Sequence, residues 1–169
     1  MIEKKNNYQD LLSLIKTTLE AQHMLQEIDI LISYLYRIES GAPQAILTKY
    51  VSHDFAISLV QSLIRNGISW DDQEKTKDFL FALKKSIERL KTLKLTIAFK
   101  PDGHMVALFS SRVRADMGGQ HILLDFSYDP SIMGGAILSF QGVYKNYTLK
   151  KRIADVFEQQ KSKILPLIQ

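Results

Sequence analysis

The side chains best suited to chemistry in this sequence are its histidines, and their spacing argues against a metal or catalytic centre. His23, His53, His104 and His121 fall in four separate predicted elements. Two metal ligands on one helix stand about three or four residues apart, and no pair of these histidines does. We therefore expect each of them to be a surface histidine or a hydrogen-bonded one, and we expect no metal site.

The paired carboxylates also have explanations other than acid–base catalysis. Asp71 and Asp72 stand at the start of a predicted helix, where capping and the helix dipole favour acidic residues. Asp125 and Asp129 flank the end of a predicted strand, and Asp129 precedes a proline, as is common in turns. Neither pair predicts general acid–base catalysis.

Nucleophile and phosphate-loop motifs are absent from the sequence. There is no cysteine, which excludes a thiol nucleophile, a disulfide and a thiolate metal site. Ser110 and Ser111 lie within a predicted helix with no histidine nearby in the sequence to activate them. Gly118 and Gly119 follow a helix rather than a strand, which is typical of a helix end and not of a phosphate cradle. These residues therefore offer no recognisable catalytic or phosphate-binding constellation.

The composition describes an ordinary folded protein. Its 169 residues suit one domain or two small ones, and 46% apolar with 24% charged residues exclude disorder as the main state. No apolar run approaches the roughly 18 residues of a membrane span. The N-terminus has basic residues without an apolar stretch behind them, so we expect no secretory signal and a cytoplasmic location.

The net charge of +4 is concentrated in two segments, 70–100 and 145–169, both largely helical by prediction. Basic helices can bind nucleic acid or an anionic membrane, but they are more often solvated surfaces. The sequence has no block of five or more Lys and Arg residues, and its strands lack the paired exposed aromatics of an RNA-recognition sheet. RNA binding stays open as an alternative, with Tyr144 and Tyr147 before the last basic helix as its best support.

The elements that must position these residues begin with helices. Apolar residues at three- and four-residue steps predict a helix from Tyr8 to about Tyr36, with a possible break near Ala21–Gln26. A turn is expected at Glu39–Pro43, and a further helix begins near Ser52 and ends at Gly67.

A long connecting helix is then predicted from Trp70 to about Leu93, capped by Ser69. Beyond it the apolar period changes to strict alternation, which indicates strands. In order, we expect a strand at 95–99, a helix at 105–117 capped by Asp102, strands at 121–128, 136–140 and 143–147, and a helix from 149 to about 165.

These elements predict an α+β protein, with an N-terminal α-helical bundle followed by a small β-α-β-β-β-α C-terminal domain. We divide it into 1–69 as the N-terminal helical domain, 70–93 as the connecting helix and 94–169 as the C-terminal domain. On the last helix we expect the apolar residues to face inward, namely Leu149, Ile153, Val156 and Phe157.

One stretch of the C-terminal part is distinctive. It runs from a strand into an Asp-Pro-Ser turn, an apolar pair, two glycines, a strand, a hairpin and a capped basic helix. Its defining residues are Asp129, Pro130, Ser131, Gly134, Gly135, Asn146 and Thr148.

This stretch resembles the C-terminal domain of the delta subunit of F-type ATP synthases, the family that includes the mitochondrial oligomycin-sensitivity-conferring protein. Asn146 stands where that family usually has an acidic residue. The resemblance implies a non-catalytic subunit of the peripheral stalk, or stator, with no cofactor. It implies that N-terminal helices bind the alpha subunits of the catalytic head and that the C-terminal domain binds the b subunits. It also implies a peripheral location on the cytoplasmic side of the membrane.

Under that resemblance, an amphipathic helix from alpha would lie in an apolar groove between the N-terminal helices. The candidate anchors for it are Leu12, Ile15, Leu31, Tyr34, Phe55 and Leu63. The terminal basic helix would meet acidic b-subunit helices through Lys150, Lys151 and Arg152.

Two alternatives stay open. The E-type stator protein of the V/A-type ATPases also ends in a small α+β domain with a Gly-Gly strand and a T-L-x-x-R helix, which Thr148, Leu149 and Arg152 resemble. That stator protein begins with a long charged coiled coil, whereas residues 8–67 here are rich in apolar residues. An RNA- or ribosome-binding protein is the alternative of another class.

Overall fold

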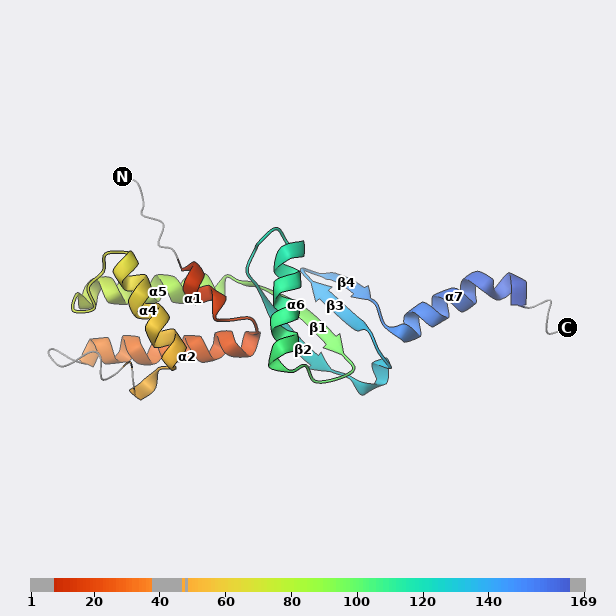
Figure 1. The fold of residues 1–169 in the computed structure, drawn as a ribbon, viewed down its shortest axis with the longest axis horizontal. Coiled ribbons are helices and arrows are strands. Elements are labelled where there is room, and N and C mark those ends of the chain that lie inside the picture. Colours follow the sequence, from red (N-terminus) through yellow and green to blue (C-terminus); the bar gives the residue numbers. More distant parts are fainter. Residues whose placement is uncertain (1–7, 38–46, 48, 165–169) are drawn as a thin grey trace.

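The N-terminal part of the described chain is built from helices that pack around one apolar core (Figure 1). The computed structural model describes residues 8–37, 47 and 49–164, and for residues 37 and 161–164 it describes the backbone alone. The helices are α1 (Gln9–Ser13), α2 (Thr18–Arg37), α4 (His53–Arg65) and α5 (Gln73–Glu88). The turn expected at Glu39–Pro43 lies outside the described residues.

The helical core is formed by side chains spaced as an amphipathic helix requires. It contains, among others, Leu11, Ile28, Leu31, Phe55, Leu59, Phe79, Leu80 and Leu83, each at most 1% exposed. Burying one such side chain contributes about 1.5–3 kcal/mol, so this cluster is the main source of stability for the helices. The ring of Tyr8 packs against this core, with its centroid 5.1 Å from that of Phe79.

The C-terminal part is a four-stranded sheet in the order β2-β1-β3-β4. Its strands are β1 (Lys91–Ile97), β2 (Ile122–Tyr128), β3 (Ala136–Phe140) and β4 (Val143–Asn146). β1 pairs with β2 in parallel through the crossover helix α6 (Gly103–Asp116), while β3 is antiparallel to both β1 and β4. A short 3-10 helix, η1 (Pro130–Ile132), follows β2, and α7 (Leu149–Ile164) ends the described chain.

α6 covers one face of this sheet. Phe109 and Val113 of α6 pack against a second apolar cluster that includes Leu93, Leu95 and Leu124. The alternation of strand side chains places Leu123 on the opposite face, where it joins the helical core. The expected α+β fold, with helices first and a β-α-β-β-β-α part after them, is confirmed.

The two parts are joined where the α1–α2 linker meets the edge of the sheet. Thr17 forms a parallel bridge with Leu124, whose backbone N–H donates to the carbonyl oxygen of Lys16 at 2.8 Å. The chain before α2 therefore forms a single β-bridge at the edge of β2, which attaches the helical part to the sheet.

The break predicted in the first helix was in the wrong place. It is interrupted at Leu14–Thr17 rather than near Ala21–Gln26, because Thr17 and Glu20 form a capping box. The Thr17 hydroxyl accepts from the Glu20 N–H at 3.2 Å, and a Glu20 carboxylate oxygen accepts from the Thr17 N–H at 2.9 Å. The interruption frees the linker to pair with β2.

The predicted helix 70–93 was too long at both ends. α5 begins after Asp72, whose carboxylate accepts from the Lys75 N–H, and it ends at Glu88. Residues from Lys91 onward belong to β1, because Leu93, Leu95 and Ile97 alternate as buried side chains against the parallel partner strand. α5 packs with α2 in the helical core.

Several local predictions were right. Asp102 caps α6 through the Met105 N–H at 2.8 Å, and Gly67 ends α4 with a positive φ of 69°. Gln141 and Gly142 form the hairpin turn between β3 and β4, with φ of 49° and 81°.

Candidate docking surfaces

The anchors predicted for the N-terminal groove are mostly part of the helical core. Ile15, Leu31, Phe55 and Leu63 are at most 2% exposed. Their side chains contact one another rather than solvent, so the structure brings them together as a core. Whether they also contact a partner stays a prediction.

The remaining two predicted anchors lie at the margin of that core. Leu12 is half-buried and packs against the core cluster. Tyr34 is half-buried, with its ring centroid 5.0 Å from that of Tyr50. Of the six predicted anchors, these two keep part of their surface accessible.

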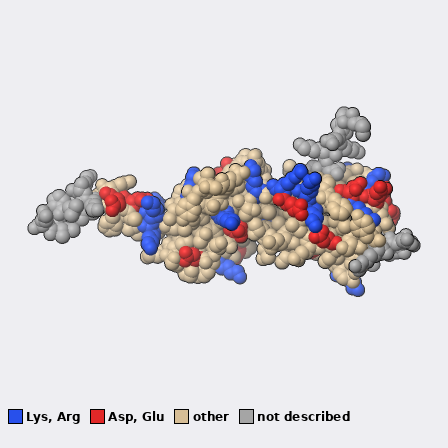
Figure 2. Space-filling view, turned by 180° about the vertical axis from the view of Figure 1, so that it is seen from behind, with Lys and Arg blue, Asp and Glu red and all other residues tan. Residues whose placement is uncertain are grey.

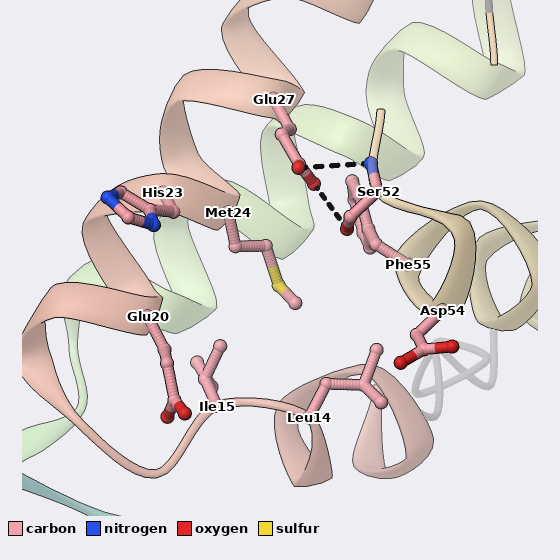
Figure 3. Close-up of a pocket in the computed structure, with 9 residues that line it drawn as sticks. All are labelled: Leu14, Ile15, Glu20, His23, Met24, Glu27, Ser52, Asp54 and Phe55. Atoms are coloured by element: carbon pink, nitrogen blue, oxygen red, sulfur yellow. Dashed lines mark hydrogen bonds between the residues drawn. The ribbon is translucent and has the colours of Figure 1, made fainter. Parts of the chain in front are cut away.

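A hollow opens beside this core, between the α1–α2 linker, α2 and the start of α4 (Figure 3). Its volume is about 240 Å³. Its apolar walls are Leu14, Ile15, Met24 and Phe55, and its polar rim is Glu20, His23, Glu27, Ser52 and Asp54. Two predicted anchors, Ile15 and Phe55, are among the residues that line this hollow, although at most 1% of either is exposed to solvent.

The rim of this hollow is acidic and locally ordered. Glu20 holds the start of α2, as described above, and Glu27 holds the start of α4. One Glu27 oxygen accepts from the Ser52 N–H at 3.0 Å and the other from the Ser52 hydroxyl at 3.1 Å (Figure 3). Asp54 is exposed in the first turn of α4. The hollow suits an apolar side chain flanked by basic residues, because the rim charges would align such a segment.

The glycines of the C-terminal motif contact the backbone at the start of α7. The Tyr147 N–H donates to the Ala136 carbonyl at 2.9 Å, and the Leu149 N–H donates to that of Gly134 at 3.0 Å. Gly135 has a φ of +84°, and a Cβ there would lie 2.3 Å from the Tyr147 carbonyl oxygen. Only glycine allows this approach, so the Gly134–Gly135 pair fixes where the last helix leaves the sheet.

The Asp-Pro-Ser residues of the motif shape the turn before those glycines. The Asp129 carboxylate accepts from the Ser131 N–H at 2.9 Å and caps η1, in which Pro130 occupies a first-turn position. Hydrogen bonds from the Ser131 side chain and then its amide lower the pKa of Asp129. These residues organise the backbone of the turn.

Asn146 and Thr148 complete the start of α7. Asn146 Oδ1 accepts from both the N–H and the hydroxyl of Thr148, at 3.0 and 2.7 Å. Thr148 Oγ1 in turn accepts from the Lys151 N–H at 3.2 Å, so Thr148 is the cap that the sequence predicts. Both donors to Asn146 are neutral, so an uncharged amide oxygen is sufficient to accept from them.

α7 itself extends away from the sheet (Figure 1). The inward orientation predicted for its apolar residues was wrong. Leu149, Ile153, Val156 and Phe157 are between 45% and 62% exposed. The helical period predicts the apolar stripe correctly, but no described element covers it.

The basic side chains predicted on α7 are exposed beside this stripe. Lys150, Lys151 and Arg152 lie in the first turns of the helix. The Lys151 ammonium pairs with the Asp155 carboxylate at 2.7 Å, which raises the pKa of Lys151. α7 is therefore an amphipathic helix with an open apolar face and a largely basic first turn.

Sequence reasoning missed one cluster at the junction of the two parts. His121 Nε2 lies 2.8 Å from the Ile15 carbonyl oxygen, and His121 Nδ1 lies 2.7 Å from Arg114 Nη2. Burial lowers the pKa of His121. His121 and Ile15 are 106 positions apart, so no sequence spacing could have shown the contact.

Within 8–37, 47 and 49–164, no three His, Asp or Glu side chains gather as a metal site would need. None of the described helices is both long and apolar enough to cross a membrane.

The sequence matches no known family model and no curated protein. Among solved structures, the chain is similar to one in the cryo-EM structure of the Toxoplasma gondii mitochondrial ATP synthase hexamer, at 10% identity. The match covers 92% of this chain and 88% of that chain, with a TM-score of 0.38, which is too low to establish a shared fold.

Proposed function

We propose that this chain is a non-catalytic stator subunit of an F-type ATP synthase, similar to the delta subunit. In this role the helical part binds alpha subunits of the catalytic head, and the C-terminal part binds b subunits. The chain would be peripheral to the membrane, on its cytoplasmic side, and would resist the torque of the rotor during proton-driven ATP synthesis.

The observation that carries this proposal is the open apolar face of α7. Leu149, Ile153, Val156 and Phe157 form one stripe, and all of them face solvent. A stripe of this kind is typical of a helix that buries its face against a partner. The motif residues support the same role, since Gly134, Gly135 and Thr148 set the direction in which α7 leaves the sheet.

The hollow in the helical part supports a second docking point. It offers apolar walls at Ile15 and Phe55 and an acidic rim at Asp54. An amphipathic helix with basic flanks fits this arrangement, with one apolar side chain in the hollow. Two separate docking points, one in the helical part and one on α7, suit a protein that links two partners.

The two alternatives receive less support. The E-type stator protein of a V/A-type ATPase would begin with a long coiled coil, whereas α1 is five residues long and α2 packs into a helical cluster. For RNA binding, a continuous basic surface would be needed. On the face shown in Figure 2, Lys and Arg side chains alternate with Asp and Glu side chains.

The experiment is a pull-down from detergent-solubilised membranes of the source organism, with the full chain as bait. We expect recovery of alpha and b subunits. Asp54→Lys should reduce recovery of alpha and leave b unchanged, while Asp78→Lys, a charge on α5 away from the hollow, serves as the matched control. Recovery of V/A-type head subunits would select the E-type alternative, and an eluate rich in RNA or ribosomal protein would refute the stator assignment.

A further inference from the structure

A cleft of about 440 Å³ lies between the α1–α2 linker and α6. Lys16 and Ser13 line it from the linker side, and Ser110, Ser111 and Arg114 line it from α6. The methyl groups of Ala107 and Ala115 form part of its wall. The cleft is distinct from both docking surfaces, and it spans the junction of the two parts of the molecule.

Two cations line this cleft without a carboxylate partner. Lys16 and Arg114 are both half-buried, and neither takes part in an ion pair with any residue that the structure describes. The residues that line the cleft include no Asp or Glu. Two cations with no acidic residue among the lining residues make the cleft locally positive, so the site favours an anion from outside the chain.

The guanidinium of Arg114 is held in place by His121. The Ile15 carbonyl can only accept a hydrogen bond, so His121 Nε2 carries the proton and donates to it. Nδ1 is then the acceptor, and it receives one N–H from Arg114 Nη2. A guanidinium has five N–H donors, so Arg114 keeps the others for a ligand while its orientation is fixed.

Ser110 supplies a neutral donor at the same place. It is 8% exposed, and no described residue accepts a hydrogen bond from its hydroxyl. The neighbouring hydroxyls are occupied, since Ser13 donates to the Asp10 carbonyl at 2.6 Å and Ser111 to that of Leu108 at 2.8 Å. The Ser110 hydroxyl is not one of the buried atoms that lack a partner, so it keeps some contact with solvent and can donate to an oxyanion that enters the cleft.

We propose that this cleft binds a small phosphate monoester, with Arg114, Lys16 and Ser110 as the donors to its phosphate oxygens. A guanidinium, an ammonium and a hydroxyl from two elements suit the several oxygens of a tetrahedral phosphate better than a planar carboxylate. The cleft is larger than one phosphate group, and its alanine wall leaves room for a small organic group. Because the ligand touches the linker and α6, its binding stabilises the junction of the two parts.

The test is a titration of the ¹⁵N-labelled full chain with inorganic phosphate and with phenyl phosphate at constant ionic strength, followed by NMR. We expect saturable shifts at Lys16, Ser110 and Arg114, a Kd of about 1 mM or tighter, and tighter binding of phenyl phosphate. Absence of saturable shifts overturns the proposal. Binding of inorganic phosphate alone overturns the assignment of a monoester.

Variants separate this site from general charge attraction. Arg114→Met and Lys16→Met should each weaken binding about tenfold or more, and Ser110→Ala should weaken it by a smaller factor. Arg112→Met is the matched control, because Arg112 is on the same helix, does not line the cleft and pairs with Asp116. Equal losses in Arg112→Met and Lys16→Met would refute the site. Circular dichroism verifies folding, and if Arg114→Met fails to fold, Lys16→Met decides.

Discussion

The helical part of this molecule buries its large apolar side chains, whereas the C-terminal end exposes several of them. In the helical part, Phe55, Phe79 and Leu83 are at most 1% exposed. In the β4–α7 region, Val143 and Phe157 are 58% and 62% exposed. The first region completes its own core, whereas the second has an apolar surface that no described element covers. The helical part thus provides most of the stability, and the C-terminal end has the larger exposed apolar surface.

The largest expected effect contrasts two phenylalanines. Phe79→Ala removes a fully buried ring and should lower the free energy of unfolding by about 3–5 kcal/mol. Phe157→Ala removes an exposed ring and should change it by less than about 0.5 kcal/mol. Urea denaturation followed by circular dichroism measures both. Equal destabilisation by the two changes would mean that α7 packs on the protein.

The next effect concerns the glycines of the C-terminal part. Gly135→Ala should destabilise the protein by about 2 kcal/mol or more, because the residue has a positive φ and its Cβ would meet the Tyr147 carbonyl. Gly142 also has a positive φ, but a Cβ there would meet nothing within 4 Å. Gly142→Ala should therefore destabilise the protein by only about 1 kcal/mol. Thermal unfolding of the two variants gives the difference. A Gly142 variant as unstable as the Gly135 variant would show that close approach is unimportant.

A smaller effect tests the linker between the two regions. Thr17→Ala removes the hydroxyl that caps α2 and should cost about 1 kcal/mol. Thr18→Ala is the control, since its hydroxyl makes only a 3.4 Å contact with Asp125. Chemical denaturation compares them, and a greater loss in the Thr18 variant would contradict the capping role of Thr17.

The smallest effect is a pH dependence at the same junction. Burial lowers the pKa of His121, so the unfolded chain binds more protons than the folded one as pH falls below about 6.5. The contribution of His121 to the free energy of unfolding is therefore fully present above that pH and declines below it. Protonation in the folded protein also places a charged ring beside the Arg114 guanidinium. We expect His121→Gln to reduce the loss of stability between about pH 7 and about pH 5. The control is His104→Gln. Because His104 is exposed on α6, this variant should keep the wild-type pH dependence of stability.

Local signals in the sequence predicted much of this fold. The caps at Asp102 and Thr148, the helix end at Gly67 and the Gln141–Gly142 hairpin follow from short-range hydrogen bonding and backbone geometry. The end of α5 was missed because leucines at 90 and 93 fit both a helical and an alternating pattern. Only the pairing of β1 with β2 decides between them.

Features that depend on tertiary neighbours could not be predicted. Periodicity located the apolar stripe of α7 but gave no information on what covers it, so its residues were wrongly placed inward. Sequence spacing also gave no sign that Lys16 and Arg114 line one cleft, because they come from distant parts of the chain. The motif residues were found by their types, yet the reason for Gly135 became visible only in its approach to Tyr147.

The central claim is that the exposed face of α7 binds the b subunits. The most direct test compares full-length Val156→Asp with Ala154→Asp as baits in the membrane pull-down. Both changes add one charge at an exposed position of α7, but only Val156 lies on the apolar stripe. We expect Ala154→Asp to recover alpha and b, and Val156→Asp to recover alpha while losing b about tenfold or more. Equal recovery of b by the two baits would contradict the account.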